Sequence, residues 1–303
     1  MRKTRKRGSK KKGRVKRKSR KKFAAEKCSP KSSKESLKFS CYTSATLHKL
    51  RDIWNKRRPD SKITSNDPRE IWGALKILMA TTCNRESCWL RKLFKKNKLN
   101  SKLRNYTFAP KQPKEWKKNP YEWLSSVELL QVMKQYENAY PSFEFLGPSP
   151  IDYDVKKMFG ECVWEELCQF KLKDFIKRGK TKIGIIFNLD PHDLEGSHWM
   201  CMFIDIKKKE IYYFDSYGDG PPRRLSKFMN EVKRQSRALG TPYTILANKR
   251  RHQFSESECG MYCLYFIIQM LLDKRFSSFQ KKKISDKKML ALRKKYFNAH
   301  KHT

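Results

Sequence analysis

The sequence predicts an α+β fold, with a strand-rich centre flanked by helices at both ends. Four short runs rich in apolar, β-branched or aromatic residues lie between positions 182 and 246, separated by polar segments, which is typical of strands. An almost wholly apolar run at 261–272 is shorter than a membrane span of about 20 residues, so it indicates a buried central helix. A chain of 303 residues has room for one large core and a second small one.

Composition divides the chain into four parts. Residues 1–35 are a basic, disordered tail that cannot fold alone, and residues 36–95 carry apolar stripes at helical spacing. Residues 96–118 are polar, basic and interrupted by prolines, which indicates a linker. We expect the principal domain to occupy residues 119–303.

The small N-terminal region is expected to contain three helices. Thr43 or Ser44 can cap the first, and Asp67 followed by Pro68 is a start signal for the second. Trp89 lies in the apolar stripe of the third. These stripes indicate a packed core and give no sign of a cofactor site.

The first half of the principal domain predicts two helices, a loop and a strand. Ser125 and Glu128 form a capping box that opens a helix. Residues 140–151 contain three prolines and are expected to be a loop. Residues 155–176 have apolar residues at helical spacing, which predicts one amphipathic helix, and residues 182–189 predict a buried strand.

Two further strands are expected to pair as a hairpin. Residues 200–206 are mostly apolar, as in a strand buried on both faces, and residues 210–214 are rich in aromatics. A turn at 207–209 brings His198 to within about one residue of the position opposite Asp215, and opposed Cβ atoms lie about 5 Å apart. The spacing therefore predicts a His–Asp pair.

The remaining elements follow in order. Two prolines precede a charged amphipathic helix at 223–238, and residues 243–246 predict a fourth strand. The buried helix at 261–272 comes next. A last helix is expected to begin near Ser285 and to close the domain.

Cys259 stands where a polar loop meets the buried helix, a position that suits a nucleophile. A helix start offers unpaired backbone N–H groups and the positive end of the helix dipole, which stabilise a thiolate. Gly260 leaves room for an approaching carbonyl group, and the amide of Gln253 can donate to its oxygen. An isolated cysteine is more often a small buried hydrophobe, so Cys259 gains weight only in combination with other residues.

Four residues together supply what thiol catalysis requires. His198 can accept the proton of Cys259, Asp215 can hold the imidazole in one tautomer, and Gln253 can stabilise the oxyanion. A histidine beside a tryptophan is more often structural, and an aspartate at a strand end is usually a turn former. The presence of all four types at workable spacing favours catalysis over these separate interpretations.

These residues resemble the pattern of a cysteine protease family that includes the SUMO-specific proteases, the adenovirus protease and the structural-polyprotein proteases of large DNA viruses. In that family a His-Trp pair is followed by Asp or Asn, and then by Gln a few residues before Cys-Gly. The resemblance extends from about residue 119 to the C-terminus, and the matching residues here are His198-Trp199, Asp215, Gln253 and Cys259-Gly260.

Within the family, the chain is most similar to the branch that contains the structural-polyprotein protease of African swine fever virus and related core-protein proteases of large DNA viruses. The similarity lies in Arg251-His252-Gln253, in Glu258-Cys259-Gly260, in residues 218–222 and in Ile284-Ser285-Asp286. Asp215 departs from that branch, which has Asn at this position, and matches the SUMO proteases.

The resemblance implies a core like that of the SUMO and adenovirus proteases, with a central mixed sheet flanked by helices and a small helical N-terminal region. It implies a viral thiol endopeptidase that cleaves virion core or structural polyproteins after Gly-containing sites during particle maturation, and it implies no cofactor. Trp199 and Gly260 would form a narrow channel for the glycine. Two alternatives stay open: a deconjugase of SUMO- or ubiquitin-like modifiers, and an inert DNA-binding virion protein.

A net charge of +41 predicts salt-sensitive attraction to polyanions, nucleic acid above all, although a lysine bias could simply give a solvated surface. The tail is the expected site of non-specific binding, with nuclear import as the alternative role. Together with this charge, the resemblance to viral proteases implies a location in the virion and the host cytoplasm, at the virus factory, or else in the nucleus. The predicted nucleic-acid-binding residues are Arg2, Lys3, Arg5, Lys6, Arg7, Lys10, Lys11, Lys12, Arg14, Lys16, Arg17, Lys18, Arg20, Lys21 and Lys22.

Nine cysteines, an odd number in a chain without a recognisable secretory signal, predict reduced thiols. Cys83 and Cys88, and likewise Cys162 and Cys168, are too widely spaced and too far from histidines to predict zinc, so no metal is expected. The chain contains no run of about 18 apolar residues, so we expect no membrane span and a soluble protein.

Overall fold

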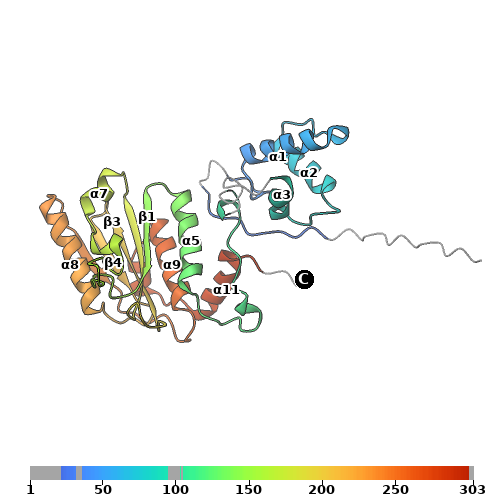
Figure 1. The fold of residues 1–303 in the computed structure, drawn as a ribbon. Coiled ribbons are helices and arrows are strands. Elements are labelled where there is room, and N and C mark those ends of the chain that lie inside the picture. The colour runs from blue at the N-terminus through green and yellow to red at the C-terminus, as the bar shows by residue number, and fades with distance from the viewer. Residues whose placement is uncertain (1–21, 32–35, 95–102, 104, 300–303) are drawn as a thin grey trace, which may run out of the picture.

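A mixed five-stranded sheet enclosed by helices forms the principal part of the chain, and three N-terminal helices form a smaller group beside it (Figure 1). The computed structural model describes residues 22–31, 36–94, 103 and 105–299. Apart from Lys22, the predicted nucleic-acid-binding residues lie outside these ranges. The predicted α+β fold with a central mixed sheet is confirmed.

The strands follow one another across the sheet in the order of the sequence. β1 and β2 are parallel, β2, β3 and β4 are successively antiparallel, and β4 and β5 are parallel. The strands are β1 (Phe143–Ser149), β2 (Lys182–Asn188), β3 (Trp199–Asp205), β4 (Glu210–Phe214) and β5 (Thr244–Ala247).

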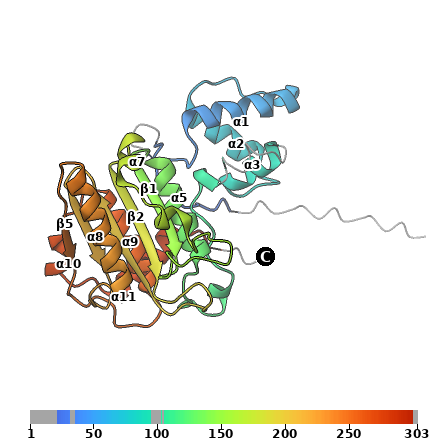
Figure 2. The same cartoon turned by 60° about the vertical axis from the view of Figure 1, so that its left-hand side comes forward.

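Helices cover both faces of the sheet (Figure 2). One face packs against α5 (Ser126–Ala139) and α9 (Cys259–Leu271), and α11 (Asp286–Tyr296) lies against α9. The other face packs against α7 (Leu172–Lys177) and α8 (Arg223–Ala238). Side chains of β3 alternate between the two clusters, which explains why the sequence of this strand is continuously apolar.

The N-terminal helices have an apolar cluster of their own, centred on Trp89, which is fully buried. Thr43 caps the first helix by accepting from the backbone N–H of Thr46, and Asp67 caps the second. The helices are α1 (Ser44–Arg57), α2 (Pro68–Leu78) and α3 (Glu86–Leu93), with the short η2 (Pro59–Ser61) between the first two. Further short elements along the chain are η3 (Glu115–Lys117), α6 (Glu165–Cys168) and α10 (Ser277–Lys281). The division of the chain at residues 35, 95 and 118 stays a prediction.

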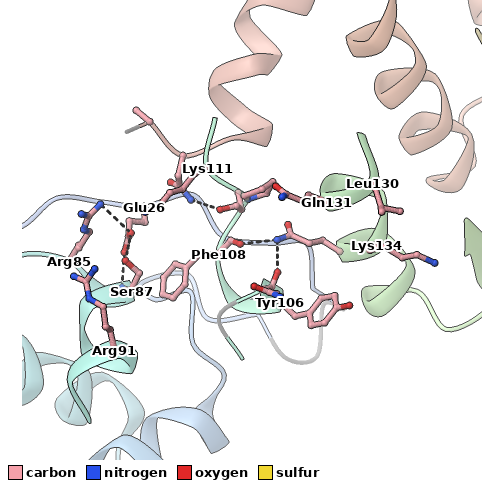
Figure 3. A pocket seen from close by; sticks show the side chains of 16 residues that line it. Glu26, Arg85, Ser87, Arg91, Tyr106, Phe108, Lys111, Leu130, Gln131 and Lys134 are labelled. Carbon is pink, nitrogen blue, oxygen red and sulfur yellow. Dashed lines mark hydrogen bonds and ion pairs between the residues drawn. The ribbon is translucent and has the colours of Figure 1, made fainter. Parts of the chain in front are cut away.

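A cavity of about 590 Å³ lies where this helical region meets α5 (Figure 3). Gln135 of α5 bridges the two parts, because its amide donates to the carbonyl oxygens of Asn105 at 2.6 Å and Phe108 at 2.8 Å. None of the four predicted catalytic residues lines this cavity. Among the described residues, no helix has the length and apolar character needed to cross a bilayer.

The prediction of a loop at 140–151 is wrong, because this segment contains β1. Its three prolines argued against a strand, yet β1 lies at the edge of the sheet, where Pro148 needs no N–H for a second partner strand. The register with β2 shifts between Leu146 and Ser149, next to this proline. An edge position is therefore what makes this sequence compatible with a strand.

The single helix predicted at 155–176 is also wrong. Only α6 and α7 are helical there, and the preceding residues form turns that include Gly160 at a φ of 82°. Phe159, which belonged to the expected apolar stripe, is 89% exposed. Phe170 and Phe175 do pack inward, so the helical spacing of these apolar residues was partly fortuitous.

The expectation of reduced thiols is wrong for six of the nine cysteines. They form the disulfides Cys28–Cys41, Cys83–Cys88 and Cys162–Cys168. Each pair is close in sequence, separated by 13, 5 and 6 positions, so local turns bring the sulfur atoms together. The odd number of cysteines therefore did not indicate whether they are paired in disulfides. The free cysteines are Cys201, Cys259 and Cys263, all buried in the principal core.

Candidate active site

His198 and Asp215 are joined by the hairpin of β3 and β4. The register pairs Cys201 with Phe214, so Asp215 lies diagonal to His198 and two positions from directly opposite it, not one as expected. The imidazole Nε2 is nevertheless 2.9 Å from Asp215 Oδ1, and both side chains are buried. A diagonal pair on one face of a hairpin is thus close enough for a long side chain to bridge.

Asn248 fixes the backbone of Asp215 from the next strand. Its Oδ1 accepts from the Asp215 N–H at 2.9 Å, and its Nδ2 donates to the Asp215 carbonyl oxygen at 2.8 Å. Asn248 follows β5 and is fully buried. Asn248, which the sequence analysis did not single out, therefore holds the backbone of the residue whose carboxylate bonds to His198. The sequence signal that could have identified Asn248 is its position directly after β5, the strand that pairs with β4.

Cys259 is the first residue of α9 and is buried. Nε2 of His198 bonds to Asp215, and the same imidazole interacts with the side chain of Cys259. Burial of His198 works against its charged form, but the hydrogen bonds to Asp215 and Cys259 and their negative charges outweigh this and raise the pKa of His198 to about 9. An imidazolium is therefore favoured in the resting site at neutral pH.

Gln253 is fully buried beside these residues, and its amide has a fixed orientation. Ser216 Oγ donates to Oε1 at 2.7 Å, so the amide nitrogen must point the other way. That nitrogen donates to the Ser255 carbonyl oxygen at 2.6 Å and lies 3.4 Å from the hydroxyl of Tyr217. The backbone N–H of Gln253 also bonds to Ser216, so this turn holds the residue at two points.

Tyr217 connects the predicted residues and was missed in the sequence. Its ring stacks on the imidazole of His198 with 4.8 Å between centroids, and its backbone N–H donates to Asp215 Oδ1 at 2.8 Å. The hairpin register gives the signal that could have found it, because extending the Cys201–Phe214 pairing places residue 217 opposite residue 198.

Gly260 and Trp199 meet at Leu124, close to Cys259. Trp199 is mostly buried and its indole N–H donates to the Leu124 carbonyl oxygen at 2.9 Å. A Cβ at Gly260 would lie 3.1 Å from Leu124 Cβ and 3.4 Å from Trp199 Cδ1. The absence of a side chain at Gly260 therefore lets the start of α9 pack closely against Leu124 and Trp199.

The residues before Cys259 are anchored by a buried arginine of α11. Arg293 donates to both carboxylate oxygens of Glu258, at 3.1 and 2.8 Å, and to the Ser257 carbonyl oxygen at 3.1 Å. Its remaining N–H groups donate to the carbonyl oxygens of Pro120 and Glu122, at 3.3 and 2.6 Å. All five donor positions of the guanidinium are thus used, and they link the nucleophile loop to the segment before Leu124.

The structure therefore joins His198 to Asp215, brings Cys259 close enough to influence the imidazole, and places Gln253 one residue away, through Tyr217. Trp199 and Gly260 are adjacent to this group. Among the described residues, no group of three or more His, Cys, Asp or Glu side chains is arranged to hold a metal ion. The geometry fits thiol chemistry, with an imidazole between a carboxylate and a sulfur atom.

Several known proteins are similar to this chain in sequence or in fold. Residues 173–303 match the Ulp1 protease family, C-terminal catalytic domain. A protein of Acanthamoeba polyphaga mimivirus named as a thiol protease is 36% identical over 180 residues, which are 58% of this chain and 57% of that protein. The SUMO-1 cysteine protease of African swine fever virus is 26% identical over 275 residues, which are 84% of this chain and 96% of that protein.

The fold is also that of a solved structure. The crystal structure of the African swine fever virus protease aligns with a TM-score of 0.63 at 21% identity, covering 90% of this chain and 96% of that one. The chain spans 57% of the length of the mimivirus relative. The resemblance stated from the sequence is confirmed, and so is the enzyme class at the level of the family. Residues 173–303 thus match the catalytic domain of the Ulp1 protease family, and the viral relatives are named as thiol or cysteine proteases, the kind of enzyme that the sequence predicts.

Proposed function

We propose that the chain is a thiol endopeptidase whose nucleophile is Cys259. The observation that carries the proposal is the position of His198, whose Nε2 bonds to Asp215 at 2.9 Å and whose imidazole also interacts with the side chain of Cys259. A histidine with a pKa of about 9 can hold the proton of the thiol before reaction and return it afterwards.

The residues have distinct roles in the reaction. Cys259 Sγ attacks the carbonyl carbon of the scissile bond, the C–N bond breaks, and His198 gives its proton to the leaving amine. Water then hydrolyses the thioester and restores the thiol. The amide of Gln253 and the backbone N–H of Cys259 would donate to the oxyanion. The bond from Ser216 supports this role, because it fixes the position of Oε1 and so leaves the amide nitrogen of Gln253 facing Tyr217.

For the substrate, we propose virion core or structural polyproteins cleaved after Gly-containing sites during particle maturation. Two observations support a requirement for glycine: Trp199 is packed against the start of α9, and Gly260 is closely covered by Leu124. This close packing beside Cys259 would leave little room for large side chains next to the scissile bond. Relatives from two large DNA viruses support the viral setting.

The test uses two substrates, a Gly-Gly-x peptide from a core protein and a SUMO fusion, with purified full-length protein. Cleavage of the peptide alone supports the endopeptidase, cleavage of the fusion alone supports the deconjugase, and cleavage of neither supports the inert virion protein. Cys259→Ala should abolish hydrolysis, whereas Cys263→Ala, one turn further along α9, is the matched control and should retain activity within about threefold.

We also propose that the first 22 residues of the basic tail bind nucleic acid without sequence preference. Its charge is the support, since most of its residues are Lys or Arg. Binding to viral nucleic acid would keep the enzyme in the virion and at the virus factory in the host cytoplasm. The nucleus is the alternative location.

A further inference from the structure

A group of cations surrounds an exposed aromatic ring beside Gln253, and no catalytic role has been assigned to it. We name this group the basic rim; it consists of Lys249, Arg250, Arg251, Phe254 and Lys283. Phe254 is 57% exposed, although it follows the buried Gln253 directly. Arg251 and Lys283 both contact its ring, with Arg251 Cζ 4.9 Å and Lys283 Nζ 3.6 Å from the centroid.

Arg251 is held in place and points toward the catalytic residues. Its Nε donates to the Gln253 carbonyl oxygen at 2.9 Å, and its guanidinium lies 5.1 Å from the ring centroid of Tyr217. The same tyrosine ring stacks on the imidazole of His198. The ring of Tyr217 therefore contacts both the guanidinium of Arg251 and the imidazole of His198.

The rim also has unbalanced positive charge. Among the described residues, no carboxylate forms an ion pair with Lys249, Arg250, Arg251 or Lys283. Asp286 is near, but its oxygens are taken by the backbone of residues 254 and 255 and by a tyrosine hydroxyl. An open groove of about 750 Å³ beside the rim is lined by Lys249, Arg250 and Arg251 together with Ala247 and Gln280.

We propose that the basic rim binds an acidic side chain of the substrate and so makes the enzyme prefer acidic residues near the scissile bond. This proposal rests on the proposed protease function. Within the part of the chain that the structure describes, neither terminal nitrogen of Arg251 has a hydrogen-bond partner; a planar guanidinium in this state suits a carboxylate, and a stacked ring keeps it from collapsing onto the surface.

The distance sets the position of the acidic residue. The ring contacts place Arg251 within about 10 Å of His198, and an extended chain advances about 3.3 Å per residue, so the acid should lie about two or three residues from the scissile bond. Nucleic acid also carries negative charge. The contacts of Arg251 with Tyr217 and Gln253 favour a substrate chain, because a nucleic acid polymer bound there would lie against the candidate catalytic residues.

The experiment compares two Gly-Gly-x peptides that differ only by Glu or Gln at these positions, at fixed salt. We expect kcat/KM for the Glu peptide to be about tenfold higher, as for one charge-assisted hydrogen bond. Arg251→Gln and Lys283→Gln should each bring the Glu-to-Gln ratio close to one. Lys227→Gln is the control, since Lys227 is an exposed cation of α8, on the other face of the sheet.

A binding measurement keeps the inference separate from the proposed function. The anisotropy of labelled Glu and Gln peptides is measured with the Cys259→Ala protein, with and without the rim substitutions, so a chain that cleaves neither peptide still gives a result. Equal ratios in the wild type and the rim variants would overturn the proposal. Rim variants that weaken only oligonucleotide binding, and leave the peptide ratio unchanged, would also overturn it and assign the rim to nucleic acid.

Discussion

Arg293 and Glu258 form an ion pair that is almost completely buried, and Glu258 directly precedes Cys259 in the sequence. Burial raises the pKa of Glu258, and the hydrogen bonds from Arg293 oppose that rise. The pair connects α11, at the end of the described chain, to the turn that positions Cys259. The C-terminal helix is therefore part of the support for the active site.

Arg293→Met should destabilise the protein by about 3–5 kcal/mol, because it leaves the carboxylate of Glu258 buried without a partner. Urea denaturation measures the change in the free energy of unfolding. Arg234→Met is the matched control: Arg234 makes a similar pair with Glu231 at 2.6 Å, but at the surface, so its loss should be barely measurable. Equal effects of the two substitutions would contradict the role given to the buried pair.

Asp215→Asn should reduce kcat by between about ten- and a hundredfold, less than the loss in Cys259→Ala. The backbone N–H of Tyr217 donates to Oδ1, so an asparagine should keep its oxygen there and still accept from His198. Steady-state kinetics on the Gly-Gly-x peptide provide the measurement. A loss as complete as in Cys259→Ala would mean that the negative charge itself is essential.

The pKa of His198 predicts how activity and stability change with pH. The folded state raises this pKa to about 9, above the usual value near 6.5, so the folded protein holds the proton more tightly. The associated stability is fully present below about pH 6.5 and is lost as the pH rises through about 9. We expect kcat/KM to fall in an alkaline limb near pH 9, and this limb should move to lower pH in Asp215→Asn.

Gly260→Ala should destabilise the protein by about 1–3 kcal/mol and lower kcat/KM, because the new methyl group would crowd Leu124 and Trp199 at the start of α9. Gly73→Ala is the control, since a Cβ at Gly73 in α2 meets no atom within 4 Å and should stabilise that helix slightly. Thermal unfolding and peptide hydrolysis are measured on both. Partial rescue in the double variant with Leu124→Ala would confirm that crowding is the cause.

Deleting residues 1–22 should weaken binding to double-stranded DNA and reduce its dependence on salt. Each phosphate neutralised adds roughly 0.9 to the slope of log affinity against log salt concentration, so the slope should fall by several units. Anisotropy titrations at different salt concentrations measure it. Hydrolysis of a short peptide is the control and should be unchanged. An unaltered slope would shift attention to cations of the folded part.

Much of the fold follows from local sequence patterns. Helix α8 has the predicted bounds, and the continuous apolar run of β3 indicated a strand buried on both faces. β1 was not predictable, because only its place at the sheet edge makes Pro148 acceptable, and edge positions are a property of the tertiary structure. The apolar spacing at 155–176 led to the wrong prediction of one helix for a similar reason. Whether an apolar side chain is buried also depends on the tertiary structure, and Phe159 is exposed.

The grouping of the predicted site residues could be anticipated where chemistry restricts residue type, and their catalytic roles stay a prediction. Thiol catalysis needs a sulfur, an imidazole and a carboxylate, and few side chains can replace them. Supporting residues are less restricted, so Asn248, Tyr217 and Arg293 could be recognised only once the strand register and the packing of α11 were known. The offset of two positions between His198 and Asp215 likewise depends on the length of the hairpin turn.

Cys259 begins a helix in which Gln269 is the one residue that is not buried. A catalytic side chain on a surface loop can change without disturbing the core, but this sulfur shares its helix with the centre of the protein. Substitutions along α9 would therefore alter packing and reactivity together. Amino-acid substitutions should therefore be tolerated least in α9. Directed evolution of a new specificity should succeed more readily with substitutions in the loops around this helix.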